Sequence, residues 1–138
     1  MFKKQPKAPK VESLREIETL ASSGKPVLID FYQPSCAPCQ VMGGIMNELS
    51  REFGESAHVI KADISRMPDV AHKFEVRSTP TMVLLTTSAP KKSKKTRNGR
   101  STAVGGVRPV TQRWRASGLV QKDILTKMLE SNGAQKVS

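Results

Sequence analysis

Hydrophobic residues recur along the chain with two different periods, and the alternation between these periods predicts the order of helices and strands. Over 11–21 the apolar positions lie three and four residues apart, which is the period of an amphipathic helix, and the Ser22-Ser23-Gly24 turn ends it. A short unbroken apolar run over 27–32 predicts a strand that is covered on both faces. The remaining expected elements are a helix over 42–53, a strand over 58–64, a short helix over 69–74, strands over 81–86 and 110–116, and a helix over 120–129.

This order of elements predicts one α/β domain in which a mixed sheet carries helices on both faces. The domain is expected to run from residue 11 to residue 132, followed by a C-terminal tail over 133–138. Segment 88–109 has no hydrophobic period and many turn-forming residues, so a long basic loop is expected before the last strand. Residues 1–10 offer little that could be buried and are expected to form a flexible basic tail.

The formal net charge of +11 is unevenly distributed along the 138 residues. Residues 1–10 and 91–115 together hold 13 of the 23 basic residues and no acidic one. The other ten basic residues accompany all 12 acidic ones, so the rest of the chain carries a net charge of −2. We therefore expect a near-neutral domain with two basic segments, which argues against a uniformly basic nucleic-acid-binding protein.

Several classes of protein are excluded or disfavoured by the sequence. No apolar run approaches the roughly 18 residues that span a bilayer, which argues against an integral membrane protein. The beginning of the chain lacks the apolar segment of a secretory signal peptide, and two cysteines cannot form the framework of a small secreted scaffold. An intracellular protein is expected, in the cytoplasm or the mitochondrial matrix and with no membrane partner.

Cys36 and Cys39 carry the strongest chemical signal, because they lie where a predicted strand ends and a predicted helix begins. The Cys-x-x-Cys spacing places two sulfur atoms within disulfide reach across one helical turn. The helix N-terminus stabilises a thiolate on Cys36, and Pro38 fits the first turn without the loss of a hydrogen bond. Two other interpretations stay open: half of a zinc site, although His58 and His72 are 14 residues apart, and a pair of inert buried thiols.

Two charged residues interrupt apolar strands. Asp30 lies within the 27–32 run, so we expect a buried carboxyl that is protonated near neutral pH or paired with a cation. Such a carboxyl could take the proton of Cys39. Lys61 lies within the 58–64 strand, and its ammonium could reach Asp30 if the two strands are neighbours. In the alternative interpretations, Asp30 points to water from an edge strand and Lys61 extends to the surface.

Pro80 directly precedes the apolar strand over 81–86, where a residue without an N–H group is tolerated only at the start. The Thr79–Pro80 bond is the best candidate for a cis peptide, which would hold an extended backbone edge beside the cysteines. An ordinary trans proline that starts the strand is the alternative.

These residues resemble the thioredoxin family in four segments between about residue 11 and residue 132: 30–32 with Cys36-Ala37-Pro38-Cys39, Lys61 with Asp63, Ser78-Thr79-Pro80-Thr81, and Gly118. The resemblance implies a thioredoxin-like fold, with a central mixed sheet flanked by helices. It implies that Cys36 is the attacking cysteine and Cys39 the resolving one. It also implies that Asp30 is the buried acid and base, with Lys61 as its neighbour.

The resemblance further implies a substrate-binding surface around the cysteines, formed by Ser35, Ala37, Pro38, Thr79, Pro80 and Gly118. The sequence departs from the family at several points. Ser35 replaces a tryptophan, Ala37 replaces a glycine, and Gly44 stands where a proline is expected. Residues 1–10 contain no convincing counterpart of the family's first strand, and the hairpin between the last two strands is expected to become a loop of about twenty residues.

Two functions follow. The first is a protein-disulfide reductase whose only redox group is the Cys36/Cys39 pair, without a cofactor or a metal. Its partners would be disulfide-containing proteins and a thioredoxin reductase or equivalent dithiol donor. The second is a thioredoxin-like binding module, docked in a ribonucleoprotein or other acidic assembly through its tail and loop, with residues 91–115 contacting RNA or an acidic partner. Trp114 is expected in the core, on the same strand face as Gln112 and Ala116.

Overall fold

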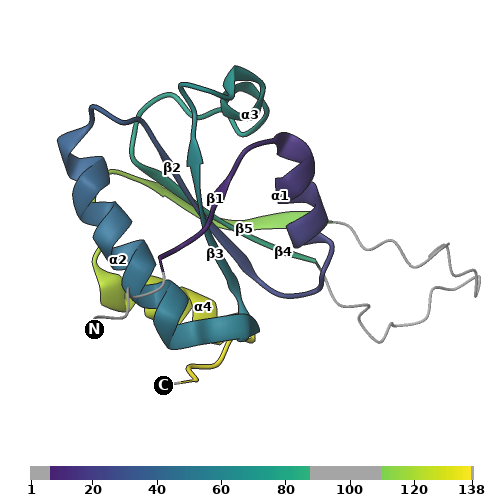
Figure 1. Ribbon diagram of the computed structural model, residues 1–138. Helices are drawn as coiled ribbons and strands as arrows, with labels where there is room; N and C mark the ends of the chain where they lie inside the picture. The colour runs from purple at the N-terminus through teal and green to yellow at the C-terminus, as the bar shows by residue number, and fades with distance from the viewer. Residues whose placement is uncertain (1–6, 88–109, 138) are drawn as a thin grey trace, which may run out of the picture.

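The computed structural model describes residues 7–87 and 110–137, which form a five-stranded sheet with helices on both faces (Figure 1). The sheet order is β1-β3-β2-β4-β5. β3 is parallel to β1 and β2, whereas β4 is antiparallel to β2 and β5 is antiparallel to β4. The expected mixed sheet is confirmed. Its strands are β1 (Lys10–Val11), β2 (Val27–Tyr32), β3 (His58–Asp63), β4 (Thr81–Thr87) and β5 (Val110–Ser117).

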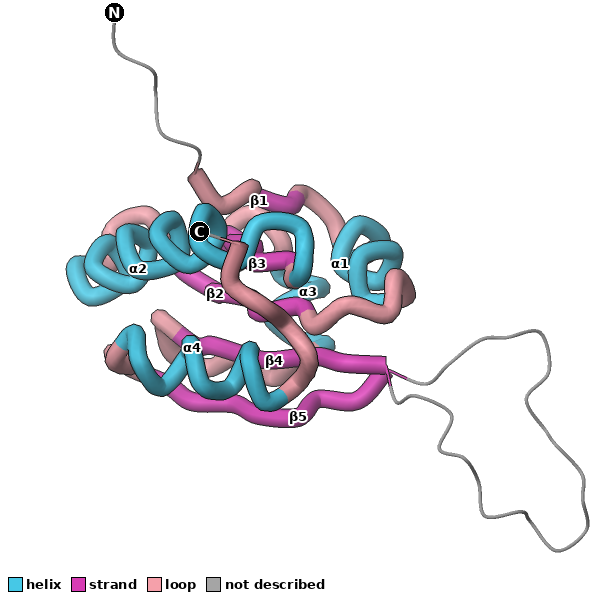
Figure 2. The backbone as a smooth tube through the Cα atoms, turned by 90° about the horizontal axis from the view of Figure 1, so that it is seen from below, coloured by secondary structure: helices cyan, strands magenta, loops and turns pink. Residues whose placement is uncertain are grey.

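Four α-helices in the described residues cover the two faces of the sheet, as the view along its edge shows (Figure 2). They are α1 (Leu14–Ala21), α2 (Ala37–Phe53), α3 (Pro68–Lys73) and α4 (Lys122–Ser131), with a short 3-10 helix (Gly54–Ser56) after α2. One core layer contains apolar residues of α2 and α4, and the other contains those of α1 and α3.

The central strand β2 contributes to both layers, because successive side chains of a strand point to opposite faces. Leu28 joins the core under α2 and α4, whereas Ile29 and Phe31 join the core under α1 and α3. Asp30 therefore points toward α2, although every neighbour in the strand is apolar. This alternation places a carboxyl group beneath the helix that begins at the cysteines.

The N-terminal boundary of the domain differs from the prediction. Val11 belongs to β1 rather than to the first helix, which begins only at Leu14. The Ser13 side chain accepts a hydrogen bond from the Glu16 N–H at 3.1 Å, and this cap fixes the start of the helix. Ala8 is buried, and its N–H donates to the Asn47 side chain at 2.9 Å. Residues 8–11 thus belong to the domain and supply the first strand that the sequence did not reveal.

The C-terminal boundary also lies further along the chain than expected. Ala134 is buried, and the Val137 N–H donates to the Glu52 carbonyl oxygen at 2.7 Å. The Ser56 hydroxyl donates to the Gln135 carbonyl oxygen at 2.7 Å. Residues 134–137 are therefore attached to the end of α2 and do not form a free tail.

A β-bulge in the last strand changes which side chains share a face. Leu84 pairs with Trp114 but Leu85 pairs with Gln112, so Arg113 is the additional residue. Trp114 and Ala116 pack against the core under α2 and α4, as expected. Gln112 instead contacts the space beside α1 and α3, so the prediction that it shares a face with Trp114 is wrong.

The ends of β4 and β5 face each other at Thr87 and Val110. The expected basic loop over 88–109 lies outside the described residues. No helix in the described ranges 7–87 and 110–137 is long and apolar enough to cross a membrane.

Candidate active site

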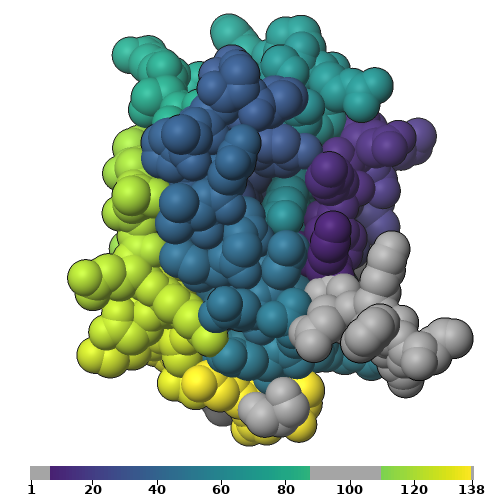
Figure 3. Space-filling model, turned by 60° about the vertical axis from the view of Figure 1, so that its left-hand side comes forward, coloured from purple at the N-terminus to yellow at the C-terminus, as the bar shows by residue number. Residues whose placement is uncertain are grey.

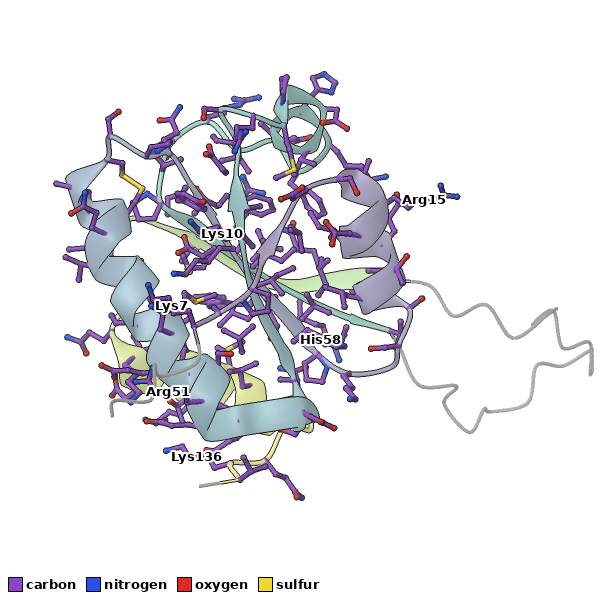
Figure 4. All side chains as sticks on the ribbon, in the orientation of Figure 1. Lys7, Lys10, Arg15, Arg51, His58 and Lys136 are labelled. Atoms are coloured by element: carbon purple, nitrogen blue, oxygen red, sulfur yellow. A yellow bond between two sulfur atoms is a disulfide. The ribbon has the colours of Figure 1, made fainter. Side chains whose placement is uncertain are left out.

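The two cysteines lie at the first turn of α2 and form a disulfide, with 5.2 Å between their Cα atoms (Figure 4). Cys36 is the N-cap residue, and its sulfur accepts a hydrogen bond from the Cys39 N–H at 3.2 Å. Pro38 occupies the first turn, where no intrahelical partner for an N–H group exists. An N–H group aimed at sulfur and the positive end of the helix dipole both favour a thiolate on Cys36.

The two sulfur-bearing residues differ in exposure. Cys39 is 4% exposed, whereas Cys36 is half-buried and reaches the surface. The sulfur of Cys36 lies 3.7 Å from the carbonyl oxygen of Thr79, on the other side of the active-site surface. Of the two, Cys36 is therefore the more accessible to a large reaction partner.

The Thr79–Pro80 peptide bond is cis, so the trans alternative is wrong. Two contacts hold this segment. The Gly118 N–H donates to the Pro80 carbonyl oxygen at 2.8 Å, and the Thr79 hydroxyl lies 3.3 Å from the Gln33 side-chain oxygen. Gly118 has a φ of +89°, a backbone conformation that residues with a side chain rarely adopt. The Thr79 backbone is thus presented beside Cys36.

Asp30 is 1% exposed, and neither carboxyl oxygen has a hydrogen-bond partner. Burial raises the pKa of Asp30 from 3.8 to about 7, while the positive charge of Lys61 acts in the opposite direction. The interpretation of Asp30 as a water-exposed edge residue is therefore wrong. A carboxyl group with this pKa can accept and donate a proton near neutral pH.

Lys61 faces Asp30 across the neighbouring strands, since their Cα atoms are register partners in the β2–β3 pair. Burial lowers the pKa of Lys61, and the carboxyl of Asp30 opposes that shift. Lys61 acts on Asp30 as a nearby charge, because the carboxyl oxygens accept no hydrogen bond from it. The half-buried ammonium has room beneath α2 because position 43 is a glycine: a methyl group there would lie 3.4 Å from the Lys61 nitrogen.

A pocket of about 370 Å³ connects these groups with the surface. Asp30, Cys39 and Lys61 all line it, together with Lys10 and Asn47. The space-filling view shows the surface hollowed between α2 and the N-terminal segment (Figure 3). The pocket provides a path by which protons can move between water and the buried carboxyl.

The residues predicted for substrate binding surround the exposed sulfur. Ser35, Ala37 and Pro38 are exposed at the start of α2, Thr79 is half-buried, and Pro80 is buried. The sequence alone did not indicate Gln33, Lys10 and Asn47 as residues of the site. Gln33 directly follows a predicted strand that leads to the cysteines, which was an available signal. Lys10 was not detectable, because it becomes a neighbour of Lys61 only through the two-residue strand β1.

The zinc interpretation of the cysteines finds no support in the structure. The described part of the chain contains no group of three or more His, Cys, Asp or Glu residues that could hold a metal ion. His58 begins β3 beside Val27, at the end of the sheet opposite the cysteines. His72 lies on α3 and is exposed. Neither histidine completes a ligand set with the two sulfurs.

Comparisons with known proteins agree with this geometry. The family model described as Thioredoxin matches residues 11–104. A thioredoxin-like protein of Synechocystis is 38% identical over 73 residues, which cover 53% of this chain and 70% of that protein. The chloroplastic thioredoxin Y of Oryza sativa is 36% identical over 73 residues, which cover 53% of this chain and 44% of that protein. The matched segment thus spans less than half the length of the rice relative.

Two solved structures have the same fold. A mutant thioredoxin from Halobacterium salinarum matches with a TM-score of 0.69 and 24% identity, covering 96% of both chains. Mitochondrial thioredoxin 3 from Saccharomyces cerevisiae matches with a TM-score of 0.61 and 24% identity, covering 89% of this chain and 93% of that one.

Proposed function

The chain belongs to the thioredoxin family, and from this premise we propose that it is a protein thiol–disulfide oxidoreductase that reduces protein disulfides through Cys36 and Cys39. One observation carries the proposal. The chain places a half-exposed sulfur beside the Thr79 backbone and bonds it to a buried sulfur that shares a pocket with an isolated carboxyl group. The first sulfur can meet a protein partner, and the second can exchange a proton with Asp30.

The first step starts from the reduced protein. The Cys36 thiolate attacks one sulfur of the substrate disulfide, a new S–S bond forms, and the other substrate sulfur leaves as a thiolate. The helix N-terminus and the Cys39 N–H stabilise the attacking thiolate. The departing sulfur takes a proton from water and becomes the first thiol of the product.

The second step releases the substrate. Asp30, as a carboxylate, accepts the Cys39 proton through the pocket, and the resulting Cys39 thiolate attacks Cys36. The Cys36–Cys39 disulfide forms, and the second substrate sulfur leaves and is protonated. Two electrons have then passed from the protein to the substrate. The Cys39 proton, released through Asp30 to the pocket water, balances one product thiol, and the proton of the other comes from water, because Cys36 reacts as a thiolate. The charge of Lys61 favours the carboxylate form of Asp30, which is the form that accepts the proton.

Substrate binding is assigned to the surface around Cys36. Thr79 and Pro80 present an extended backbone edge, and Ser35, Ala37, Pro38 and Gly118 complete the surface. Since Ser35 is small, a partner contacts less apolar area here than it would on a tryptophan. We infer disulfide-containing proteins as substrates and a thioredoxin reductase or an equivalent dithiol donor as the recycling partner.

We also infer that the Cys36/Cys39 pair is the whole redox group, without a further cofactor. A reducing compartment inside the cell suits this chemistry, and the cytoplasm or the mitochondrial matrix stays our prediction. Two plant relatives are named as chloroplastic thioredoxins, which also supports a location in an organelle.

The alternative function, a binding module docked through residues 91–115, is not proposed. Residues 91–109 of this segment lie outside the described residues, and the guanidinium group of Arg115 is bonded to two backbone carbonyl groups of the same chain. No observation on the described residues favours contact with RNA or an acidic partner.

The proposal is tested by reduction of the insulin disulfides with dithiothreitol as the electron source. The wild-type protein is expected to accelerate the reaction, and Cys36→Ser is expected to abolish the acceleration. Ser23→Ala is the control, because Ser23 is exposed in the turn before β2, at the end of that strand opposite the cysteines, and its substitution should not change the rate of reduction. Equal rates with the wild-type protein and with Cys36→Ser would contradict the proposed function.

A further inference from the structure

Arg115 joins two elements that are far apart in the sequence. Its guanidinium group donates one hydrogen bond to the Phe74 carbonyl oxygen and another to the Glu75 carbonyl oxygen, both at 2.6 Å. Arg115 belongs to β5, whereas Phe74 and Glu75 follow the last residue of α3. Arg115 is half-buried; its bond to Phe74 is partly shielded from water, whereas its bond to Glu75 is exposed. Charge-assisted hydrogen bonds of this kind are about twice as strong as neutral ones.

The two accepting carbonyl groups lie at the end of a short helix in an unfavourable backbone conformation. Glu75 has a φ of 53°, which is the left-handed region, and it is the only described residue other than glycine with a positive φ. Such a conformation is unfavourable for a residue with a side chain. α3 has only six residues, and a cation at its C-terminal end stabilises the last carbonyl groups. Arg115 therefore offsets the cost of the turn at Glu75.

The turn leads directly to the active-site surface. Val76, Arg77 and Ser78 connect Glu75 with Thr79, whose carbonyl oxygen lies beside the Cys36 sulfur. Arg77 and Ser78 are exposed, and the Val76 N–H donates back to the Ala71 carbonyl oxygen at 2.9 Å. The buried Val76 side chain and the Ser78 carbonyl oxygen, which accepts a hydrogen bond from the Thr81 hydroxyl at 2.7 Å, are further contacts of segment 76–79, and Arg115 adds to them at the turn before it.

The other end of this segment is also attached to β5. The Ser117 and Thr81 hydroxyl groups lie 3.3 Å apart, and the Gly118 N–H donates to the Pro80 carbonyl oxygen. Segment 76–79 thus spans two attachment points on the last strand: Arg115 at its beginning, and Ser117 with Gly118 at its end. An open pocket of about 430 Å³ lies along it, lined by Glu75, Arg77, Ser78, Gln112, Arg115 and Ser117.

We propose that Arg115 is a positioning residue, which fixes segment 76–79 and thereby determines how tightly a protein substrate binds beside Cys36. The inference rests on the proposed function and deepens it. Arg115 touches neither sulfur, so it acts on the substrate only through the backbone that it holds. A protein substrate needs this backbone, whereas a small disulfide that contacts only Cys36 does not.

The geometry requires arginine and not merely a positive charge. Two carbonyl oxygens of consecutive residues are bound by two different nitrogens of one planar group, which a lysine cannot do. The bulge at Arg113 also matters, because it sets the register that turns Arg115 toward α3. Arg113 itself is exposed and provides a matched control of equal charge on the same strand.

The test compares Arg115→Met, Arg115→Lys and Arg113→Met in two assays: insulin reduction, for which kcat and KM are determined, and reduction of a small aromatic disulfide. Arg115→Met is expected to raise KM for insulin roughly tenfold. This factor corresponds to a loss of about 1.4 kcal/mol in the free energy of substrate binding when both hydrogen bonds are removed. Its kcat and its rate with the small disulfide should stay within about twofold of wild type. Arg115→Lys should have a KM for insulin between those of wild type and Arg115→Met. Arg113→Met should have the wild-type KM.

A second variant separates positioning from folding. In a Glu75→Gly background the positive φ costs little, so Arg115→Met should raise KM by a smaller factor than in the wild-type background. Circular dichroism at the assay temperature establishes that each variant is folded, and the assays are run below the lowest melting temperature. Faster amide exchange at Val76 in folded Arg115→Met would report the loosened segment directly.

The inference is overturned if Arg115→Met leaves KM for insulin unchanged, if it slows both substrates equally, or if Arg113→Met has the same effect. A failure of the proposed function would look different, because the wild-type protein itself would then not reduce insulin.

Discussion

The two sides of the disulfide differ in burial, in charge and in the type of backbone that forms them. The front side, defined by Thr79, Pro80 and Gly118, is a backbone edge at the surface, held by the hydrogen bond from the Gly118 N–H, directly after β5, to the Pro80 carbonyl oxygen. The back side, defined by Asp30, Lys61 and the pocket beneath α2, consists of side chains on neighbouring parallel strands. In the proposed reaction, the front side would contact the protein substrate, and the back side would exchange protons with water.

This difference assigns separate tasks to the two cysteines. Cys36 reaches the front side, where backbone groups can align a substrate without regard to its sequence. Cys39 is buried on the back side, where a carboxyl group with a raised pKa can remove its proton. Substitutions on the two sides should therefore affect different steps of the reaction, and this can be tested.

The largest effect is expected from Cys39→Ser, which removes the resolving sulfur and leaves the front side intact. Turnover should fall on the order of a hundredfold or more, because the protein no longer has a second sulfur that can attack the mixed disulfide at Cys36. A stable covalent complex with an oxidised substrate should accumulate, detectable by non-reducing electrophoresis and mass spectrometry. Cys36→Ser should give no such complex. If both variants accumulated the covalent complex equally, the assignment of different roles to the two sulfurs would be wrong.

Asp30→Asn is expected to change how stability depends on pH. The folded protein binds the Asp30 proton with a pKa of about 7, whereas the unfolded chain binds it with a pKa near 3.8. The folded state therefore holds the proton more tightly, and this contribution to stability is complete below pH 4 and is lost as the pH rises to about 7. The loss amounts to about 4 kcal/mol. Urea unfolding at a series of pH values should show the free energies of wild type and Asp30→Asn diverging by this amount.

The same variant should slow the resolution step by about tenfold or more near pH 7, since the proton acceptor is missing. Rapid-mixing measurements of mixed-disulfide decay would show it. If the wild-type and Asp30→Asn stability curves stay parallel from pH 4 to pH 8, the carboxyl group does not titrate in this range. Asp30 would then not be the proton acceptor for Cys39.

A smaller effect is expected from Lys61→Met. The positive charge of Lys61 lowers the pKa of Asp30, so its removal should raise that pKa further above its ordinary value. The pH at which resolution reaches half its maximal rate should therefore move upward, while KM for insulin stays unchanged. Lys25→Met is the matched control, because Lys25 precedes β2 at the opposite end of the sheet. A downward shift would mean that Lys61 does not act on Asp30 through its charge.

The smallest effect is expected from Gly44→Ala in α2, on the wall of the back-side pocket. A methyl group at this position would meet no atom within 4 Å, and alanine favours the helix over glycine. The free energy of unfolding should rise by about 0.5–1 kcal/mol, measured by chemical denaturation. Gly43→Ala should gain less, because its methyl group would lie 3.4 Å from the Lys61 nitrogen. Equal gains at both positions would show that Lys61 has free space beneath the helix.

The sequence predicted the back side better than the front side, and the reason is local. Asp30 stands out within an unbroken apolar run, so burial and a raised pKa follow from its immediate neighbours. The hydrogen bonds of Arg115 and Gly118 join residues that are about 40 positions apart, and no local pattern indicates them. The bulge at Arg113 was also invisible, because the alternation of apolar and polar residues in β5 is weak.

The first strand was missed for a different reason. β1 has only two residues, too few to show a period of two, and Val11 also fits the helical spacing that follows it. Its position is set by tertiary contacts: the buried Ala8, the bond from the Lys61 N–H to the Pro9 carbonyl oxygen at 2.9 Å, and the pairing of Lys10 with Lys61. Tertiary pairing, and not local preference, determines where this domain begins.

The pairing of Thr87 with Val110 has a consequence for the way this domain could acquire new properties. The chain leaves the sheet and re-enters it at adjacent points, while the opposite end of the β4–β5 pair lies beside the disulfide. Seven residues of β4, roughly 20 Å of extended chain, separate the two ends. We therefore expect that a segment of different length or composition can join Thr87 to Val110 with little effect on the geometry around the disulfide.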